Sequence, residues 1–260
     1  MPQADVNGQR LSYTDSGSGE DVIIFSHGLF MDGSMFDPQV AALPDGWRAI
    51  AWDERGHGAT VTTDDPFTYW DSASDAFGLL DHLGIERAVF AGMSQGGFLS
   101  LRAALTAPER VRALVLMDTQ AGVEDPAKLP GYDQLLEAWV APDGPPQEVL
   151  DTVAAIILGQ GYDGTAHWQE RWRAMPKDKV RQVYETLNGR EDLNPRLGEI
   201  TKPALVVHGE EDLAIEIPIA QQLASDLNAE FVSVPGGGHA ANLTHPDVVN
   251  EALVAFLARV

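Results

Sequence analysis

The sequence predicts an α/β fold, in which a mostly parallel central sheet is flanked by helices. Short, continuous apolar runs such as Val22–Phe25 and Val111–Met117 are typical of strands buried on both faces. Segments with apolar residues at helical spacing separate these runs, for example Tyr69–Leu83, which ends before Gly84. Strand and helix patterns that alternate in this way indicate a parallel sheet covered by helices. With 44% hydrophobic residues in 260, the chain can bury the core that such a fold needs.

The other elements follow from the same patterns. Residues 4–16 alternate and contain Asn7-Gly8, which predicts an antiparallel hairpin at the start of the chain. Further strands are expected at Arg48–Trp52, Ala88–Ala91, Ala204–His208 and Glu230–Val234. Further helices are expected at Phe98–Leu105, Pro218–Leu227 and Pro246–Val260.

Between Asp118 and Lys202 the character of the sequence changes. Prolines cluster, the segments between them look helical, and no run typical of a buried strand occurs. Half of the six tryptophans lie here, namely Trp139, Trp168 and Trp172. We therefore expect a helical cap, residues 120–201, inserted into a core formed by residues 1–119 and 202–260.

Composition excludes several classes of function. The 17 Lys and Arg against 39 Asp and Glu give a net charge of −22, which disfavours nucleic acid and anionic membranes as partners. The absence of cysteine excludes disulfides, a thiolate metal site and a thiol nucleophile. Because the start of the chain lacks the pattern of a signal peptide and no apolar stretch is long enough for a membrane span, we expect a cytoplasmic protein.

A serine nucleophile is predicted at Ser94, in the run Gly92–Gly96 that reads Gly-Met-Ser-Gln-Gly. A serine hydroxyl reacts only when a base takes its proton, and a tight turn from strand to helix presents it above a sheet. Small residues two positions to either side permit that turn. Here the strand Ala88–Ala91 and the helix Phe98–Leu105 are expected on the two sides of the serine.

The base and the acid of such a site are expected in loops that follow strands. Among the seven histidines, His239 is favoured because it follows the strand 230–234 through a flexible proline and glycine run, with His245 as the alternative. Asp212 is favoured as the acid, because it lies between Ser94 and His239 in the chain, and serine, aspartate, histidine is a chain order known for such triads. Asp118, at the end of the strand 111–117, remains the alternative acid.

The site also needs donors for the negative oxygen that acyl transfer creates. We expect the backbone N–H of Gln95 and that of Leu29 to form this oxyanion hole. Phe30, Met93 and Trp139 are candidates for an apolar substrate pocket. No metal and no cofactor are expected.

The motifs together resemble those of the α/β-hydrolase superfamily. The resemblance rests on five runs that span almost the whole chain: Ser26–Gly28, Asp53–Gly58, Gly92–Gly97, His208–Asp212 and Gly238-His239. Among its members the chain looks most like small bacterial esterases, enol-lactonases and cofactor-free haloperoxidases or perhydrolases. The resemblance implies a helical cap over the site. It argues against dehalogenases and epoxide hydrolases, which use an aspartate where this chain has Ser94.

These observations predict a serine hydrolase acting on a small carboxylic ester or lactone through Ser94, His239 and Asp212. Three alternatives stay open: hydrolysis of a carbon–carbon bond in a diketone-type substrate, a perhydrolase, and a small-molecule receptor without catalysis. The sequence does not identify the substrate or the oligomeric state.

Overall fold

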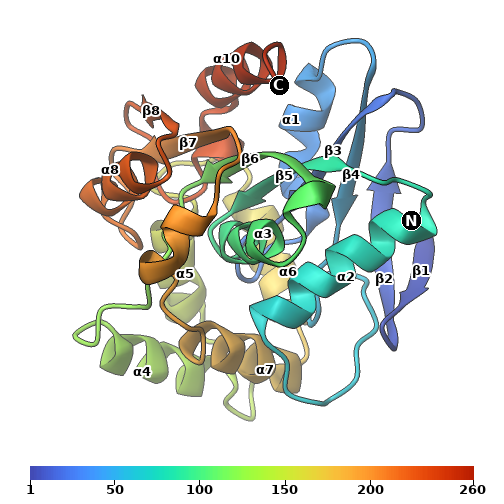
Figure 1. Cartoon of the computed structure of the whole chain (residues 1–260). Coiled ribbons are helices and arrows are strands. Elements are labelled where there is room, and N and C mark those ends of the chain that lie inside the picture. Colours follow the sequence, from blue (N-terminus) through green and yellow to red (C-terminus); the bar gives the residue numbers. More distant parts are fainter.

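The computed structural model describes all 260 residues, which form one sheet with helices on both faces (Figure 1). The strands are β1 Gln3–Val6, β2 Gln9–Asp15, β3 Asp21–Ser26, β4 Trp47–Trp52, β5 Ala88–Met93, β6 Val111–Met117, β7 Ala204–Gly209 and β8 Glu230–Val234. The helices are α1 Asp37–Ala42, α2 Tyr69–His82, α3 Gln95–Thr106, α4 Leu129–Trp139, α5 Gln147–Ile157, α6 Thr165–Ala174, α7 Lys177–Asn188, α8 Ile217–Asp226, α9 Ala241–Thr244 and α10 Pro246–Leu257. None of these helices is both long and apolar enough to cross a membrane.

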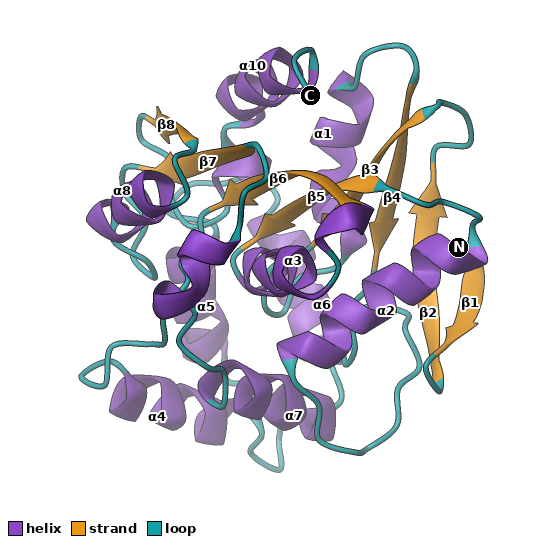
Figure 2. Cartoon of the chain, in the orientation of Figure 1, coloured by secondary structure: helices purple, strands orange, loops and turns teal.

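The sheet has the strand order β1-β2-β4-β3-β5-β6-β7-β8 (Figure 2). The hairpin of β1 and β2 is antiparallel and joins β4 in an antiparallel pairing, whereas every pairing from β4 to β8 is parallel. The predicted α/β class with a mostly parallel sheet is therefore confirmed. The carboxyl ends of β5, β6, β7 and β8 consequently meet at one edge, where loops from distant parts of the sequence come together.

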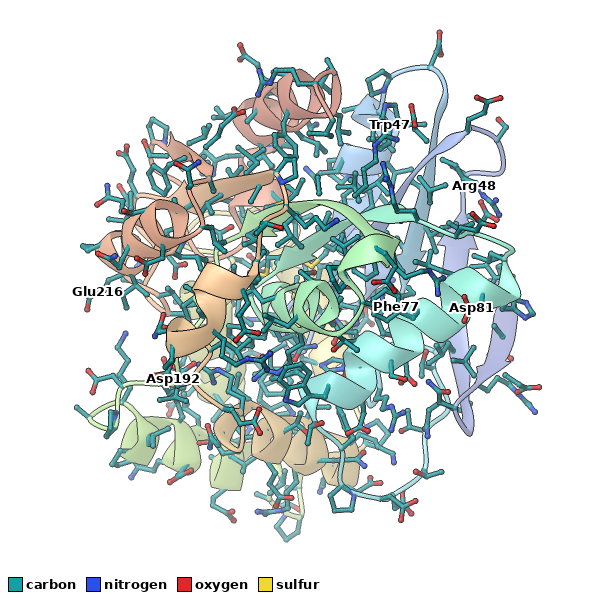
Figure 3. The ribbon with its side chains drawn as sticks, in the orientation of Figure 1. Trp47, Arg48, Phe77, Asp81, Asp192 and Glu216 are labelled. Carbon is teal, nitrogen blue, oxygen red and sulfur yellow. The ribbon has the colours of Figure 1, made fainter.

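The opening hairpin is set by its turn and by one ion pair. Asn7 and Gly8 have φ of 48° and 78°, the left-handed conformation that a two-residue hairpin turn requires at both positions. Arg48 of β4, labelled in Figure 3, donates to both carboxylate oxygens of Asp15 in β2 at 2.9 and 2.7 Å. This bidentate pair fixes the antiparallel edge to the parallel part of the sheet.

Alternate residues of the strands enter two separate hydrophobic cores. In β3, Ile24 packs on the side of α2, α3 and α8, while Ile23 and Phe25 pack on the side of α1 and α10. Helix α2 packs on only one of these cores: Phe77 contacts Phe90 of β5 with ring centroids 5.3 Å apart, whereas Asp81, one turn further on, is exposed (Figure 3). Burial on both faces explains why the strands appear in the sequence as continuous apolar runs.

Helices α4 to α7 fill the interval between β6 and β7, in which the structure has no strand. The buried rings of Trp139, Trp168 and Trp172 belong to the same hydrophobic cluster as the sheet residues on the α10 side. Several hydrogen bonds tie these helices to loops of the core, and two of them reach the loops that contain Phe30 and His239. Trp172 Nε1 donates to the Phe30 carbonyl at 2.9 Å, and Ala240 N donates to the Ile157 carbonyl at the end of α5 at 2.8 Å.

Candidate active site

Ser94 occupies the turn between β5 and α3 in a strained conformation. Its φ of 51° and ψ of −114° lie outside the regions that residues with a side chain normally adopt. Two hydrogen bonds to β6 and its end hold the turn: Ser94 N donates to the Met117 carbonyl at 2.9 Å, and Thr119 Oγ1 donates to the Ser94 carbonyl at 2.7 Å. The surroundings therefore fix the strained backbone that presents the hydroxyl.

The two glycines of the serine motif are required by contacts with backbone atoms. A Cβ on Gly96 would lie 1.9 Å from the carbonyl oxygen of Ser26, and one on Gly92 would lie 2.1 Å from the carbonyl of Gly96. Backbone atoms of β3 and α3 cannot move aside as a flexible side chain can. The spacing of the glycines thus follows from the close approach of α3 to the sheet.

Gly96→Ala is expected to lower the free energy of unfolding by about 3 kcal/mol or more, because the added methyl overlaps backbone. Denaturant unfolding followed by circular dichroism measures the change. Gly131→Ala is the matched control, since a Cβ there meets nothing within 4 Å in α4 and alanine favours the helix. Equal stability of the two variants would contradict the close approach.

His239 and Asp212 stand in line with the serine hydroxyl. His239 Nε2 lies 3.0 Å from Ser94 Oγ, and His239 Nδ1 lies 2.8 Å from Asp212 Oδ2. The second oxygen of Asp212 accepts from Ala214 N at 2.8 Å and from Ile215 N at 3.0 Å. The structure thus brings together the three residues that the sequence favoured, whereas His245 directly precedes α10 and its Nδ1 lies 2.9 Å from Thr244 Oγ1.

The charges around His239 favour a role as the base that takes the proton of Ser94. Burial favours the neutral form of His239, but the charge and the hydrogen bond of Asp212 outweigh it and raise the pKa of His239 above its ordinary value, with contributions from Asp118 and Glu124. Burial alone would raise the pKa of Asp212, yet His239 and the backbone donors lower it below its usual range. Asp212 is therefore ionised at neutral pH and orients the ring.

A pH profile of kcat/KM is expected to show an acid limb with its midpoint above 6.5, the ordinary pKa of histidine. Only the neutral imidazole can accept the proton of Ser94, and its raised pKa extends the protonated form to higher pH. Initial rates on an ester with a pH-independent chromophore measure the limb. A midpoint below 6.5 would contradict the influence of Asp212.

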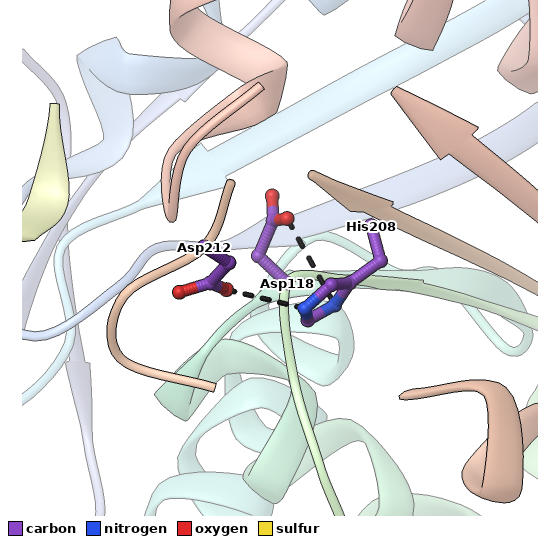
Figure 4. A group of neighbouring side chains, drawn as sticks. All are labelled: Asp118, His208 and Asp212. Atoms are coloured by element: carbon purple, nitrogen blue, oxygen red, sulfur yellow. Dashed lines mark ion pairs between the residues drawn. The ribbon is translucent and has the colours of Figure 1, made fainter. Parts of the chain in front are cut away.

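Asp118, the alternative acid, lies close to Asp212 and His208 (Figure 4), but its hydrogen bonds are with backbone groups. It accepts from Gly209 N at 2.8 Å and from Ala241 N at 3.2 Å, and it has no hydrogen bond with His239. Burial, followed by the charge of Asp212, raises the pKa of Asp118 well above its ordinary value. Asp118 thus joins the loop of the acid to the loop of the histidine.

His208 completes this buried cluster, which is also the place where a metal ion has to be considered. Its Nε2 donates to the Ile215 carbonyl at 2.8 Å and lies 3.3 Å from Asp212 Oδ2, while its Nδ1 is 3.9 Å from Asp118 Oδ1. Ligand atoms of the three side chains fall within 4.8 Å of one another. Because both aspartates already accept N–H groups and His208 Nε2 donates to a carbonyl, we interpret the cluster as a hydrogen-bonded support of the acid.

Two neutral histidines shape the loop after β3. His27 Nδ1 donates to the Gly28 carbonyl and its Nε2 accepts from Glu54 N, at 2.8 and 2.9 Å. His57 Nδ1 donates to the Arg55 carbonyl and its Nε2 accepts from Phe30 N, at 2.8 and 3.1 Å. Burial lowers the pKa of both rings, which keeps each nitrogen in one role.

The backbone N–H groups of the two expected oxyanion donors, Leu29 and Gln95, are free of partners within the protein. Leu29 N–H has no acceptor within the protein, although its neighbours Gly28 N and Phe30 N do. Gln95 is the first residue of α3, so its N–H lies outside the hydrogen-bond ladder of the helix. Both amides are thus available to a developing negative oxygen.

A cavity of about 110 Å³ opens on Ser94 and His239, and fifteen of its eighteen lining residues are hydrophobic. The three pocket candidates from the sequence, Phe30, Met93 and Trp139, all line it. Nine lining residues that the sequence did not single out come from or border the inserted helices, among them Glu124, Tyr132, Leu135, Ile156, Tyr184 and Leu187. Apart from Glu124, these residues lie in ordinary amphipathic helices, whose sequence pattern does not distinguish a pocket wall from a core.

The eight-stranded sheet and the serine turn define a known class, and the chain belongs to the α/β-hydrolase fold family. A family model described as "alpha/beta hydrolase fold" matches residues 21–246.

Individual relatives extend over almost the whole chain. A putative carbamate hydrolase, RutD, of Caulobacter vibrioides is 28% identical, with 92% of this chain and 91% of the relative covered. The 3-oxoadipate enol-lactonase 2 of Acinetobacter baylyi is 27% identical, with 96% and 93% covered. Among solved structures, the enol-lactonase from Burkholderia xenovorans superposes with a TM-score of 0.88 at 28% identity, over 99% of this chain and all of that one. The expected relation to hydrolases is therefore confirmed.

Proposed function

We propose that the protein is a serine hydrolase that cleaves a carboxylic ester or a lactone through an acyl-enzyme. The observation that supports it most is the continuous chain of hydrogen bonds from Asp212 through His239 to Ser94, which ends at an apolar cavity. We also propose that residues 120–201 act as a cap, since α4, α5 and α7 supply much of the cavity wall.

In this mechanism Ser94 Oγ attacks the acyl carbon while His239 Nε2 takes its proton. The N–H groups of Leu29 and Gln95 stabilise the negative oxygen of the tetrahedral intermediate. His239 then gives the proton to the leaving oxygen, which for a lactone stays attached to the acyl group. Water activated by His239 hydrolyses the acyl-enzyme, and Asp212 holds the imidazole in the required tautomer throughout.

The substrates in the names of the relatives agree with attack of a nucleophile on an acyl carbon. A carbamate and an enol-lactone both present a carbonyl to a nucleophile, and the site offers one nucleophile, one base and two amide donors to either. The mostly hydrophobic wall supports a substrate with an apolar acyl or alcohol part.

A panel of esters and lactones of graded acyl and alcohol size tests the proposal, with labelling by a fluorophosphonate probe as a second readout. We expect turnover of several members and covalent labelling at Ser94. Cleavage of a diketone-type substrate without any ester or lactone turnover would favour the carbon–carbon hydrolase instead. Absence of both turnover and labelling would overturn the proposal in favour of a receptor.

A further inference from the structure

One carboxylate lies in the otherwise apolar wall of the cavity. Glu124, in the segment between β6 and α4, lines the same cavity as Ser94 and His239, and its side chain is only 11% exposed. A carboxylate in such surroundings is costly unless a partner compensates its charge. Its presence therefore needs both a partner and a reason.

The partner is Arg190, which follows α7 and does not line the cavity. Its Nη2 donates to Glu124 Oε1 at 2.8 Å, its Nε to the Gly122 carbonyl at 3.0 Å, and its Nη1 to the Leu187 carbonyl at 2.8 Å. The guanidinium also lies 4.4 Å from the ring centroid of Phe98. These contacts fix the arginine, which in turn fixes the Glu124 carboxylate from outside the cavity.

The arrangement leaves one acceptor unused. Arg190 occupies Oε1, while Oε2 of Glu124 receives no hydrogen bond from the protein. No lysine or arginine lines the cavity, and Glu124 and His239 are its two ionisable groups apart from the tyrosines. The cavity thus offers a fixed negative acceptor to a ligand and no cation.

We propose that Glu124 determines specificity, by selecting esters or lactones whose apolar body ends in a hydrogen-bond donor, a hydroxyl or an ammonium group, and by excluding those that carry a carboxylate. This inference rests on the proposed function. A donor group would complete the acceptor capacity of Glu124 and gain a charge-assisted hydrogen bond. A substrate carboxylate would be buried against a like charge without a partner.

The test uses four 4-nitrophenyl acyl esters of equal length, ending in methyl, hydroxyl, ammonium or carboxylate, with kcat/KM measured for each. For the intact protein we expect kcat/KM for the esters that end in hydroxyl or ammonium to exceed kcat/KM for the ester that ends in a carboxylate by about tenfold or more. The hydroxyl and ammonium arms show which donor the site takes.

Two variants test the role of Glu124 itself. Glu124→Gln keeps an oxygen for Arg190 and is expected to lower the ammonium-to-methyl ratio and raise the carboxylate-to-methyl ratio, each by about tenfold. Glu124→Leu is expected to lower the hydroxyl-to-methyl ratio as well. Because Glu124→Leu leaves the buried Arg190 without its carboxylate, Glu124→Gln keeps the test valid if the leucine variant does not fold. Glu185→Gln, on the exposed side of α7, is the matched control and should leave all ratios unchanged.

Equal ratios in the intact protein and both variants would overturn the inference and leave Glu124 as a structural partner of Arg190, while the methyl ester is still cleaved. A purely structural role would also lower all four rates together. Failure of the proposed function is distinguishable, because then not even the methyl ester is cleaved faster than by Ser94→Ala, and both proposals are overturned.

Discussion

Ser94→Ala is expected to lower kcat for an activated ester on the order of 10⁵-fold. The methyl group cannot attack the carbonyl, and what remains is the contribution of the amide donors and of substrate binding. The fold is expected to persist, since the only side-chain hydrogen bond of Ser94 is the one to His239. Initial rates at saturating ester, together with thermal unfolding, measure both effects.

Ser100→Ala provides the matched control. Ser100 is a buried serine in α3, close to Ser94 in the chain, and its Oγ donates to the Gly96 carbonyl at 2.6 Å. We expect this variant to lose about 1 kcal/mol of stability and to keep its turnover. Turnover retained by Ser94→Ala would remove Ser94 from the reaction.

Asp212→Asn is expected to lower kcat by about 10⁴-fold with little change in KM. The amide can place its NH₂ group toward His239, which then presents the wrong tautomer to Ser94. The negative charge that stabilises the imidazolium in the transition state is also lost. A kcat-against-KM comparison on one ester measures the effect.

Asp118→Asn decides between the two aspartates that the sequence offered as the acid. Its two oxygens accept from Gly209 N and Ala241 N, and an amide can accept only one of them on its oxygen. We therefore expect a loss of about 1–3 kcal/mol in stability and less than about a tenfold loss of kcat. A larger loss of kcat in Asp118→Asn than in Asp212→Asn would assign the acid role to Asp118.

The strands were predictable because burial on both faces leaves a continuous apolar run. β6 is such a strand and has the bounds that the sequence predicts, Val111–Met117. The bounds of the edge strand β8, Glu230–Val234, are also as predicted, although only Val234 is buried there. Helices α1 and α9 were missed, since six and four residues are too few to show a helical period. Helix α3 begins at Gln95 and not at Phe98, because the glycines of the turn belong to the helix although they have low helix propensity.

The closeness of Ser94, Asp212 and His239 in space was predictable from the topology of the sheet. Ser94, Asp212 and His239 each follow a strand, and the carboxyl ends of parallel strands meet at one edge. The approach of His208 to Asp118 depends on the register between β6 and β7, which a single sequence does not reveal. Glu124 lies in an irregular segment with no period, so no pattern indicated that it faces the cavity.

The hydrogen bond from Ala240 N to the Ile157 carbonyl has a thermodynamic consequence. Ala240 adjoins His239, and Ile157 ends α5, so this bond joins the base to the inserted helices. Any fluctuation that lifts α5 from the core breaks an anchor of the histidine loop, and any ligand that holds α5 down strengthens it. The position of α5 and the alignment of the His239 ring are thereby linked equilibria, so that whatever stabilises one also stabilises the other.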